Sequence, residues 1–159
     1  MKALAEKPWV RTVADTVLAL ALVAWVGGHA ALGAFAARIV FRDLPRAIAS
    51  SAMTTIFRSF DGLILAAMLV VLAAAVLRAL TGVGSRAERI VVGAAFALVA
   101  LGAFEVLWLH PHIEELFQAG RTLEPAFASL HKLSARCANV EIALTALILG
   151  AQAWSRARS

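Results

Sequence analysis

Four long apolar stretches within 159 residues constrain this chain more than any other feature of its sequence. A helix needs about 20 apolar residues to cross the hydrocarbon core of a bilayer, and each stretch is close to that length. The chain is 62% hydrophobic and 16% charged, whereas a soluble domain is nearer half apolar and a quarter charged. The sequence therefore predicts an all-α fold, an integral membrane four-helix bundle of one domain. The predicted spans are residues 13–37, 60–80, 88–109 and 127–154.

Prolines punctuate the connections between these spans. Residues 38–55, which contain Pro45, are predicted to join the first two spans. Pro111 is predicted to stop or bend the third helix, because proline lacks an N–H and clashes with the preceding turn. Pro125 suits the first turn of the fourth helix. Four spans place both termini on the same side of the membrane.

The net charge of +5 comes from basic residues that gather at the ends of the apolar stretches. That placement favours contact with lipid headgroups and argues against nucleic acid as a partner. Nearly equal numbers of basic residues flank the two sides, so the positive-inside rule favours cytoplasmic termini only weakly. We expect a bacterial inner membrane protein. The residues at the ends of the stretches are Arg11, Arg38, Arg42, Arg78, Arg86, Arg89, Arg156 and Arg158.

Ionisable residues interrupt every span: His29, Asp61, Glu105 and Glu141. Such groups are costly at membrane depth, so they usually face the bundle interior and are candidates for function. On the fourth helix one narrow stripe carries a histidine, a carboxylate and two hydroxyls, with Asn139 on its flank. The residues of that stripe are His131, Ser134, Glu141 and Thr145.

These side chains predict a site for a transition-metal ion or a small solute, formed by His131, Glu105 and Glu141 with His29 as a further ligand. Imidazole and carboxylate ligands suit zinc, copper, nickel or iron. The spacing matches no compact metal motif. The alternative for each residue is hydrogen bonding between helices, which polar groups in membranes commonly form.

Other residues are assigned to packing and structure. Trp25, Gly27 and Gly28 lie where a second helix can approach closely. Arg58 and Asp61 are three residues apart, so they are expected to pair on one helix face. A group of polar residues at the end of the third helix is interpreted as part of an interfacial loop. The alternative, which the spacing supports only weakly, is a metal site. That group contains Glu105, His110, His112, Glu114 and Glu115.

Two further functions stay open. If its small-residue faces dock other helices, the chain would be a structural or accessory subunit of a larger membrane complex, or it would form a homo-oligomer. A haem or quinone redox protein would need two inward imidazoles at matching depth. His29 lies near mid-helix while His110 and His131 lie nearer helix ends, which argues against haem. No activated serine or cysteine arrangement is visible, so we do not expect an enzyme.

The segment AWVGGHAALGAFAARIVFRDLPRAIASSAMTTIFRSFD resembles the opening of the four-helix transmembrane protein 205-like family of unknown function, and FASLHKLSARCAN is similar to that family's start of helix four. Its first motif also resembles the copper-resistance D membrane domain. The resemblance implies a metal-related or transport role, since the family has been associated with platinum-drug resistance and export. His29 departs from the family pattern. The matching positions are Trp25, Gly27, Phe41, Leu44, Pro45, Phe57, Glu105, Pro111, Leu130, His131, Ser134 and Asn139.

Overall fold

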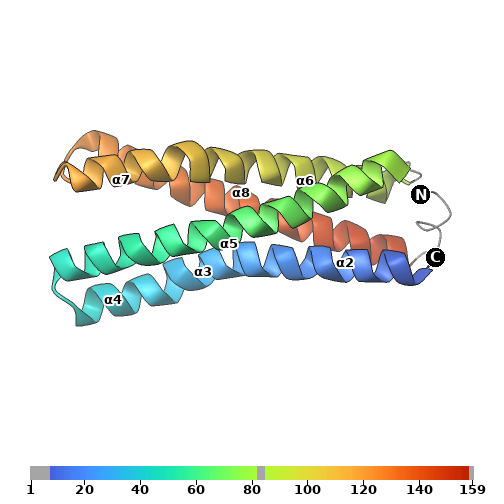
Figure 1. Cartoon of the computed structure of the whole chain (residues 1–159), viewed down its shortest axis with the longest axis horizontal. Coiled ribbons are helices and arrows are strands. Elements are labelled where there is room, and N and C mark those ends of the chain that lie inside the picture. The colour runs from blue at the N-terminus through green and yellow to red at the C-terminus, as the bar shows by residue number, and fades with distance from the viewer. Residues whose placement is uncertain (1–7, 82–84, 158–159) are drawn as a thin grey trace.

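The chain folds into four long helical rods that lie side by side (Figure 1). The computed structural model describes residues 8–81 and 85–157, and these contain helices and turns but no strand. The predicted all-α four-helix bundle is therefore confirmed. The first rod contains α2 (Pro8–Leu22), the π-helical turn η1 (Val23–Gly27), α3 (Gly28–Ala31), the π-helical turn η2 (Leu32–Ala36) and α4 (Ala37–Asp43). The others are α5 (Arg46–Thr81), then α6 (Arg86–Phe104) with the π-helical turn η3 (Glu105–Leu109) and α7 (His110–Gln118), and α8 (Pro125–Arg156).

All four rods are long and apolar enough to cross a membrane. The candidate spans are Thr12–Asp43, Ile48–Ala79, Arg86–Gln118 and Pro125–Ser155, each of 31 to 33 residues. At about 1.5 Å per residue each is roughly 45–50 Å long, which exceeds the ~30 Å hydrocarbon core. The rods therefore extend beyond the hydrocarbon at their ends, and they fit an integral membrane protein.

The first connection is much shorter than predicted, and the assignment of residues 38–55 to it is wrong. The first rod stays helical to Asp43 and α5 begins at Arg46. Leu44 has extended backbone angles, φ −117° and ψ 148°, as expected for the residue before a proline. The carbonyl of Pro45 then accepts a hydrogen bond from Ala49 N–H at 2.9 Å. Only the two residues before Arg46 are needed to reverse the chain.

Local sequence also explains where the third and fourth rods begin. Ser85 and Glu88 form a capping box before α6, in which each side chain accepts a hydrogen bond from the backbone N–H of the other residue. α8 begins at Pro125, the position predicted for it. Before it, Gly120 adopts φ +70°, a left-handed conformation that glycine adopts without steric cost.

The start of α2 and the end of α8 lie at one end of the bundle, called here the terminal end (Figure 1). The α4–α5 and α7–α8 connections lie at the opposite end, called the turn end. α6 packs against both α5 and α8, and α2 packs against α5. This antiparallel order brings segments that are far apart in the sequence to the same depth.

A dense apolar core fills the terminal half of the bundle. Glycine allows one close contact at its edge: a Cβ at Gly102 would lie 2.3 Å from Cζ2 of Trp25, so any side chain there would displace the indole ring. Gly28 has the same relation to Phe60, whereas Gly27 faces only Val23 of its own rod. The most buried core side chains include Leu18, Leu22, Ile64, Val71, Leu98 and Ile148.

The outer surface carries many large apolar side chains. Phe35 is 70% exposed, Leu69 68% and Leu107 71%. A soluble monomer rarely exposes contiguous apolar surface on this scale. The exposed side chains fit contact with lipid.

Candidate functional site

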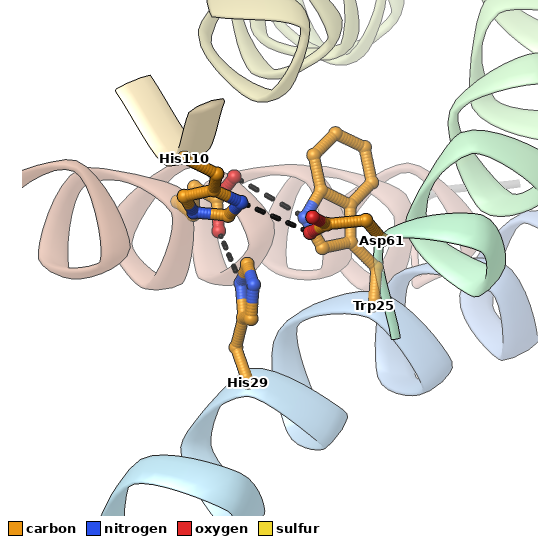
Figure 2. Close-up of polar contacts among 5 residues, drawn as sticks. Trp25, His29, Asp61 and His110 are labelled. Atoms are coloured by element: carbon orange, nitrogen blue, oxygen red, sulfur yellow. Dashed lines mark hydrogen bonds and ion pairs between the residues drawn. The ribbon is translucent and has the colours of Figure 1, made fainter. Parts of the chain in front are cut away.

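Six polar side chains from all four rods meet near the middle of the bundle, and Figure 2 draws all of them except Glu105. We call them the central cluster. Asp61 lies fifteen residues after the start of α5, roughly 22 Å along a rod of about 54 Å at 1.5 Å per residue. The cluster therefore sits at membrane depth. Its members are Trp25, His29, Asp61, Glu105, His110 and Glu141.

Glu141 on α8 connects two side chains of the first rod. Its Oε1 accepts a hydrogen bond from Trp25 Nε1 at 3.2 Å, and its Oε2 lies 3.1 Å from His29 Nδ1. Glu141 and Trp25 are both fully buried. The indole ring packs against Gly102 of α6, which fixes its direction. This carboxyl group is thus positioned by three rods.

A second histidine–carboxylate pair lies beside the first. His110 Nδ1 is 2.9 Å from Asp61 Oδ1, which links α7 to α5. The His29 and His110 rings are 6.4 Å apart between centroids at an angle of 79°, and His29 also contacts the Phe60 ring at 5.2 Å. In both histidines Nδ1 is engaged by a carboxylate, so Nε2 is the ring nitrogen that remains for another partner. Figure 2 shows both rings and both pairs.

Glu105 is the least satisfied member of the cluster. Its side chain is 1% exposed, and its Oε2 has no hydrogen-bond partner within residues 8–81 and 85–157. Its carboxyl group has the Glu141 carboxyl and the Ser134 hydroxyl within hydrogen-bonding reach. Two carboxylates side by side in a dry site repel each other. A cation, either a proton or a metal ion, is needed to hold the pair together.

The charge of the cluster is unbalanced. It contains three carboxyl groups and two imidazoles, but no arginine or lysine. Arg58 and Arg78 of α5 are engaged elsewhere: Arg58 pairs with Glu114, and Arg78 pairs with Asp15. Arg136, five residues before Glu141 on α8, is exposed. The cluster therefore attracts positive charge from outside itself.

π-helical turns adjoin the cluster on two rods. η1 contains Trp25 and ends two residues before His29, while η3 begins at Glu105 and ends immediately before His110. In η3 the N–H of His110 bonds to the carbonyl of Glu105, five residues back. The sequence predicts that Pro111 stops or bends the third helix, and the rod continues through this proline, so the helix does not stop there. The wider turn precedes the proline and changes the direction of the side chains around it, as π-helical turns at functional sites often do.

The four residues predicted to bind a metal ion do not all converge. His29, Glu105 and Glu141 belong to the central cluster, but His131 is exposed and its ring packs on Phe127 at 4.5 Å. Ten residues of helix separate His131 from Glu141, about 15 Å at 1.5 Å per residue. Within the described parts of the chain, no three His, Cys, Asp or Glu side chains are arranged to hold a metal ion.

The structure changes the interpretation of the other predicted residues. Arg58 bonds to Glu114 of α7 instead of Asp61, because α7 presents an acidic partner to α5 one turn away from His110. His110 joins the cluster, whereas His112 is exposed and contacts the Trp108 carbonyl at 2.7 Å. Ser134 lies half-buried beside Glu105, and Asn139 is exposed. The argument that His29 and His110 lie at different depths is also wrong, since their rings are neighbours.

A second polar group was not anticipated from the sequence. Asp15 of α2 is 4% exposed, pairs with Arg78 of α5 and lies 3.4 Å from the Gln152 amide of α8. We call these three residues the terminal cluster. An aspartate in the first span, an arginine ending the second and a glutamine in the fourth are all visible in the sequence. Their common depth follows only from the antiparallel order of the rods.

Fold and site together define an integral membrane four-helix bundle with a buried ionisable cluster. The chain matches the family described as domain of unknown function (DUF4149) over residues 20–122. This match covers more than half of the chain, and the chain belongs to that family. It includes His29, Asp61, Glu105 and His110 but ends before Glu141. No curated protein and no solved structure matches the chain. The resemblance to the transmembrane protein 205-like proteins and to the copper-resistance D domain stays a prediction.

Proposed function

We propose that this protein binds a cation at the central cluster and helps to move it through the membrane, with protons and a metal ion competing for the same groups. The observation that carries the proposal is an excess of carboxyl groups, of which Glu105 and Glu141 are fully buried and Asp61 is 21% exposed. Three lie at membrane depth with no arginine or lysine in the cluster, and one carboxylate oxygen has no partner in the described residues. Ionisable residues inside a membrane commonly mark ion pathways and proton relays.

The two histidines are the favoured metal ligands. A histidine that binds a metal ion usually has its other ring nitrogen bonded to a carboxylate, which fixes the ring and raises its basicity. His29 and His110 both have such a carboxylate. Two imidazoles on one tetrahedral metal ion have ring centroids about 5 Å apart, because each metal–nitrogen bond is about 2.0–2.1 Å. The His29 and His110 centroids are 6.4 Å apart, so the two rings would approach each other by about 1 Å to bind one tetrahedral ion, and water or a carboxyl oxygen would complete its coordination.

Metal analysis on four histidine variants tests this proposal. The protein is purified in mild detergent without chelator, and bound metal is measured directly and after equilibration with Zn²⁺, Cu²⁺ or Co²⁺. His29→Ala and His110→Ala are expected to lose the metal. His112→Ala and His131→Ala, both outside the cluster, are the matched controls and are expected to retain it. Equal binding by all four variants, or no binding by the unchanged protein, would overturn the metal part of the proposal.

Proton binding is tested on the same samples. Binding of a metal ion to protonated ligands releases protons, so affinity should fall as the pH is lowered. Proton release on addition of Zn²⁺ is expected to decrease in Glu105→Gln, because this variant removes a carboxyl group next to Glu141. An absorption spectrum of the purified protein is recorded first. A Soret band would show that the protein binds haem instead of a metal ion alone.

An accessory role is the second candidate function. Gly28 and Gly102 are occupied by contacts inside the bundle, but a Cβ at Gly33 or Gly93 would meet no atom within 4 Å. Glycines on an outer face allow another membrane helix to approach closely. Stoichiometric co-purification of a second membrane protein, lost in Gly33→Leu or Gly93→Leu, would support this candidate. A single monomeric species would contradict it.

A further inference from the structure

We infer that the hollow between α5 and α7 near the turn end is a vestibule through which a hydrated cation reaches the central cluster. The class of ligand, a cation, rests on the proposed function. The position and lining of the hollow do not depend on that proposal. The hollow has a volume of about 140 Å³. A water molecule takes about 30 Å³ of liquid volume, so several waters fit. Its lining residues are Ser51, Thr54, Thr55, Arg58, Ser59, Phe117 and Gln118.

The hydroxyl groups of the vestibule present acceptors. Thr54, Thr55 and Ser59 each donate the hydroxyl proton to the carbonyl four residues earlier, at 3.0, 3.1 and 3.0 Å. With the proton used inside the helix, each oxygen has lone pairs left for another group. An acceptor-rich lining suits a hydrated cation, whose water shell donates hydrogen bonds outward.

One ion pair separates the vestibule from the cluster. Arg58 lines the hollow and bonds to Glu114, while Asp61 and His110 form a second α5–α7 pair one turn away. Arg58 is 67% exposed and Glu114 is 27% exposed, so the pair is accessible to solvent and able to open. Glu114 neutralises the only cation in the lining, which removes its repulsion of an approaching cation.

The interior of the bundle in the opposite direction is apolar. Between the cluster and the terminal end the interior is filled by apolar side chains, among them Leu22, Ile64, Leu98 and Ile148, which are all fully buried. Beyond them lies the terminal cluster, whose aspartate is already paired with Arg78. A hollow of about 290 Å³ also lies in this half, between α2 and α8, and its lining is mostly apolar apart from Asp15, Thr16 and Gln152. The more polar lining of the hollow near the turn end therefore points to access from that end.

Reaction of an introduced thiol with charged reagents tests the vestibule. Ser59→Cys is made in a Cys137→Ser background, which removes the only native thiol. Membrane-impermeant cationic and anionic thiosulfonates of similar size are applied separately to each face of sealed, oriented vesicles. From the turn end the cationic reagent is expected to react about 10-fold faster or more. Leu65→Cys, on a different exposed face of α5 outside the lining, is the control and should show no such preference.

Two second-site variants make the test sharper. Glu114→Gln leaves Arg58 without its carboxylate, so the preference for the cationic reagent should disappear or reverse. Arg58→Ala should increase it. The inference would be overturned if Ser59→Cys, with Arg58 and Glu114 unchanged, reacted faster with the anionic reagent. Reaction mainly from the terminal end would overturn it as well.

The thiol-labelling test of the vestibule and the metal-binding test of the proposed function can fail independently. If the histidine variants show no metal binding while Ser59→Cys keeps its cation preference, the vestibule stands and the metal proposal fails. If metal binds through His29 and His110 but Ser59→Cys shows no charge preference, the cluster stands and the vestibule is wrong. Slower labelling of Ser59→Cys in the presence of Co²⁺ alone would support both.

Discussion

The two buried polar groups of this bundle differ in charge balance. In the terminal cluster one carboxylate, Asp15, has an arginine and an amide as partners. In the central cluster three carboxyl groups share two imidazoles and one indole N–H, and Glu105 Oε2 has no partner among the described residues. A balanced buried pair is complete within the protein, whereas two buried carboxyl groups side by side attract a cation. The comparison fits a structural role for the terminal cluster, and it fits the binding role that we propose for the central cluster.

Removing Arg78 should have the largest effect on stability. Arg78→Ala removes the arginine that pairs with the buried Asp15 carboxylate, and breaking a buried pair in this way costs about 3–5 kcal/mol. Thermal unfolding in detergent measures the loss. Arg58→Ala is the matched control: its pair with Glu114 is exposed, so the cost should be below about 1 kcal/mol. Restored stability in the double variant Asp15→Asn, Arg78→Gln would confirm that the unpaired charge is the cause. Equal stability of the two single variants would contradict the contrast.

Two glycines of α6 should respond oppositely to alanine. Gly102→Ala places a Cβ 2.3 Å from the Trp25 ring, and overpacking of this kind costs about 1–3 kcal/mol. The displaced indole would also weaken its bond to Glu141, so metal binding should fall as well. Gly93→Ala meets nothing within 4 Å and should be neutral or stabilising by up to about 1 kcal/mol, from helix propensity. The midpoint of thermal unfolding and the metal content are measured for both. A stable, metal-binding Gly102→Ala protein would show that Trp25 is not held by this contact.

Glu105→Gln should raise stability while lowering function. The amide removes one of two adjacent carboxyl groups and can donate to Glu141, and relieving one unsatisfied buried group is worth about 1 kcal/mol. The corresponding change in the terminal cluster, Asp15→Asn, should lower stability because the buried ion pair with Arg78 is removed. Opposite signs in thermal unfolding would confirm that the two clusters have different roles. Destabilisation of both would mean that Glu105 is satisfied in the native membrane and serves packing.

The exposed loop pair gives the smallest expected effect. Arg121 Nε lies 2.6 Å from Glu124 Oε1 in the α7–α8 connection, and this contact lowers the pKa of Glu124. A carboxyl group whose pKa is lower in the folded state stabilises the fold above its unfolded pKa of about 4.3, and the contribution is lost as the pH falls through the folded pKa. Unfolding midpoints of the unchanged protein and Glu124→Gln should therefore converge at low pH, and high salt should remove the small difference. A difference that grows on acidification would contradict this assignment.

Much of the architecture was predictable because it depends on local patterns. Apolar stretches of membrane-crossing length identify four helices, and Pro125 identifies the start of the last one. The ends of the rods were less predictable: the helix through Arg38–Asp43 and the start of α5 at Arg46 have enough polar residues to resemble a loop. At these positions the helices continue beyond the hydrocarbon core. Hydropathy alone does not show whether the polar residues there are helical or form a loop.

The site was only partly predictable. His29, Asp61, Glu105 and Glu141 stand out because each is an ionisable residue within an apolar stretch. Partners were harder to assign, since sequence spacing relates only residues on one helix. Arg58 was paired with Asp61 on that basis, and its real partner belongs to α7. His131 shares a helical stripe with Glu141, but ten residues of rise put it beyond the cluster.

The sequence by itself determined that the chain forms four apolar helices, that His29, Asp61, Glu105 and Glu141 lie within them, and where the last helix begins, because these depend on hydropathy, charge and proline. Tertiary structure alone decided that His29 and His110 meet, that Glu141 bonds to Trp25, and that Glu105 lies beside Glu141 while Asp15 lies beside Arg78. The physical reason is that contacts between rods depend on the depth of each residue along the bundle and on the rotation of each rod about its axis. An antiparallel bundle sets which residues of different rods share a level, and packing contacts such as Trp25 against Gly102 set which faces of the rods meet.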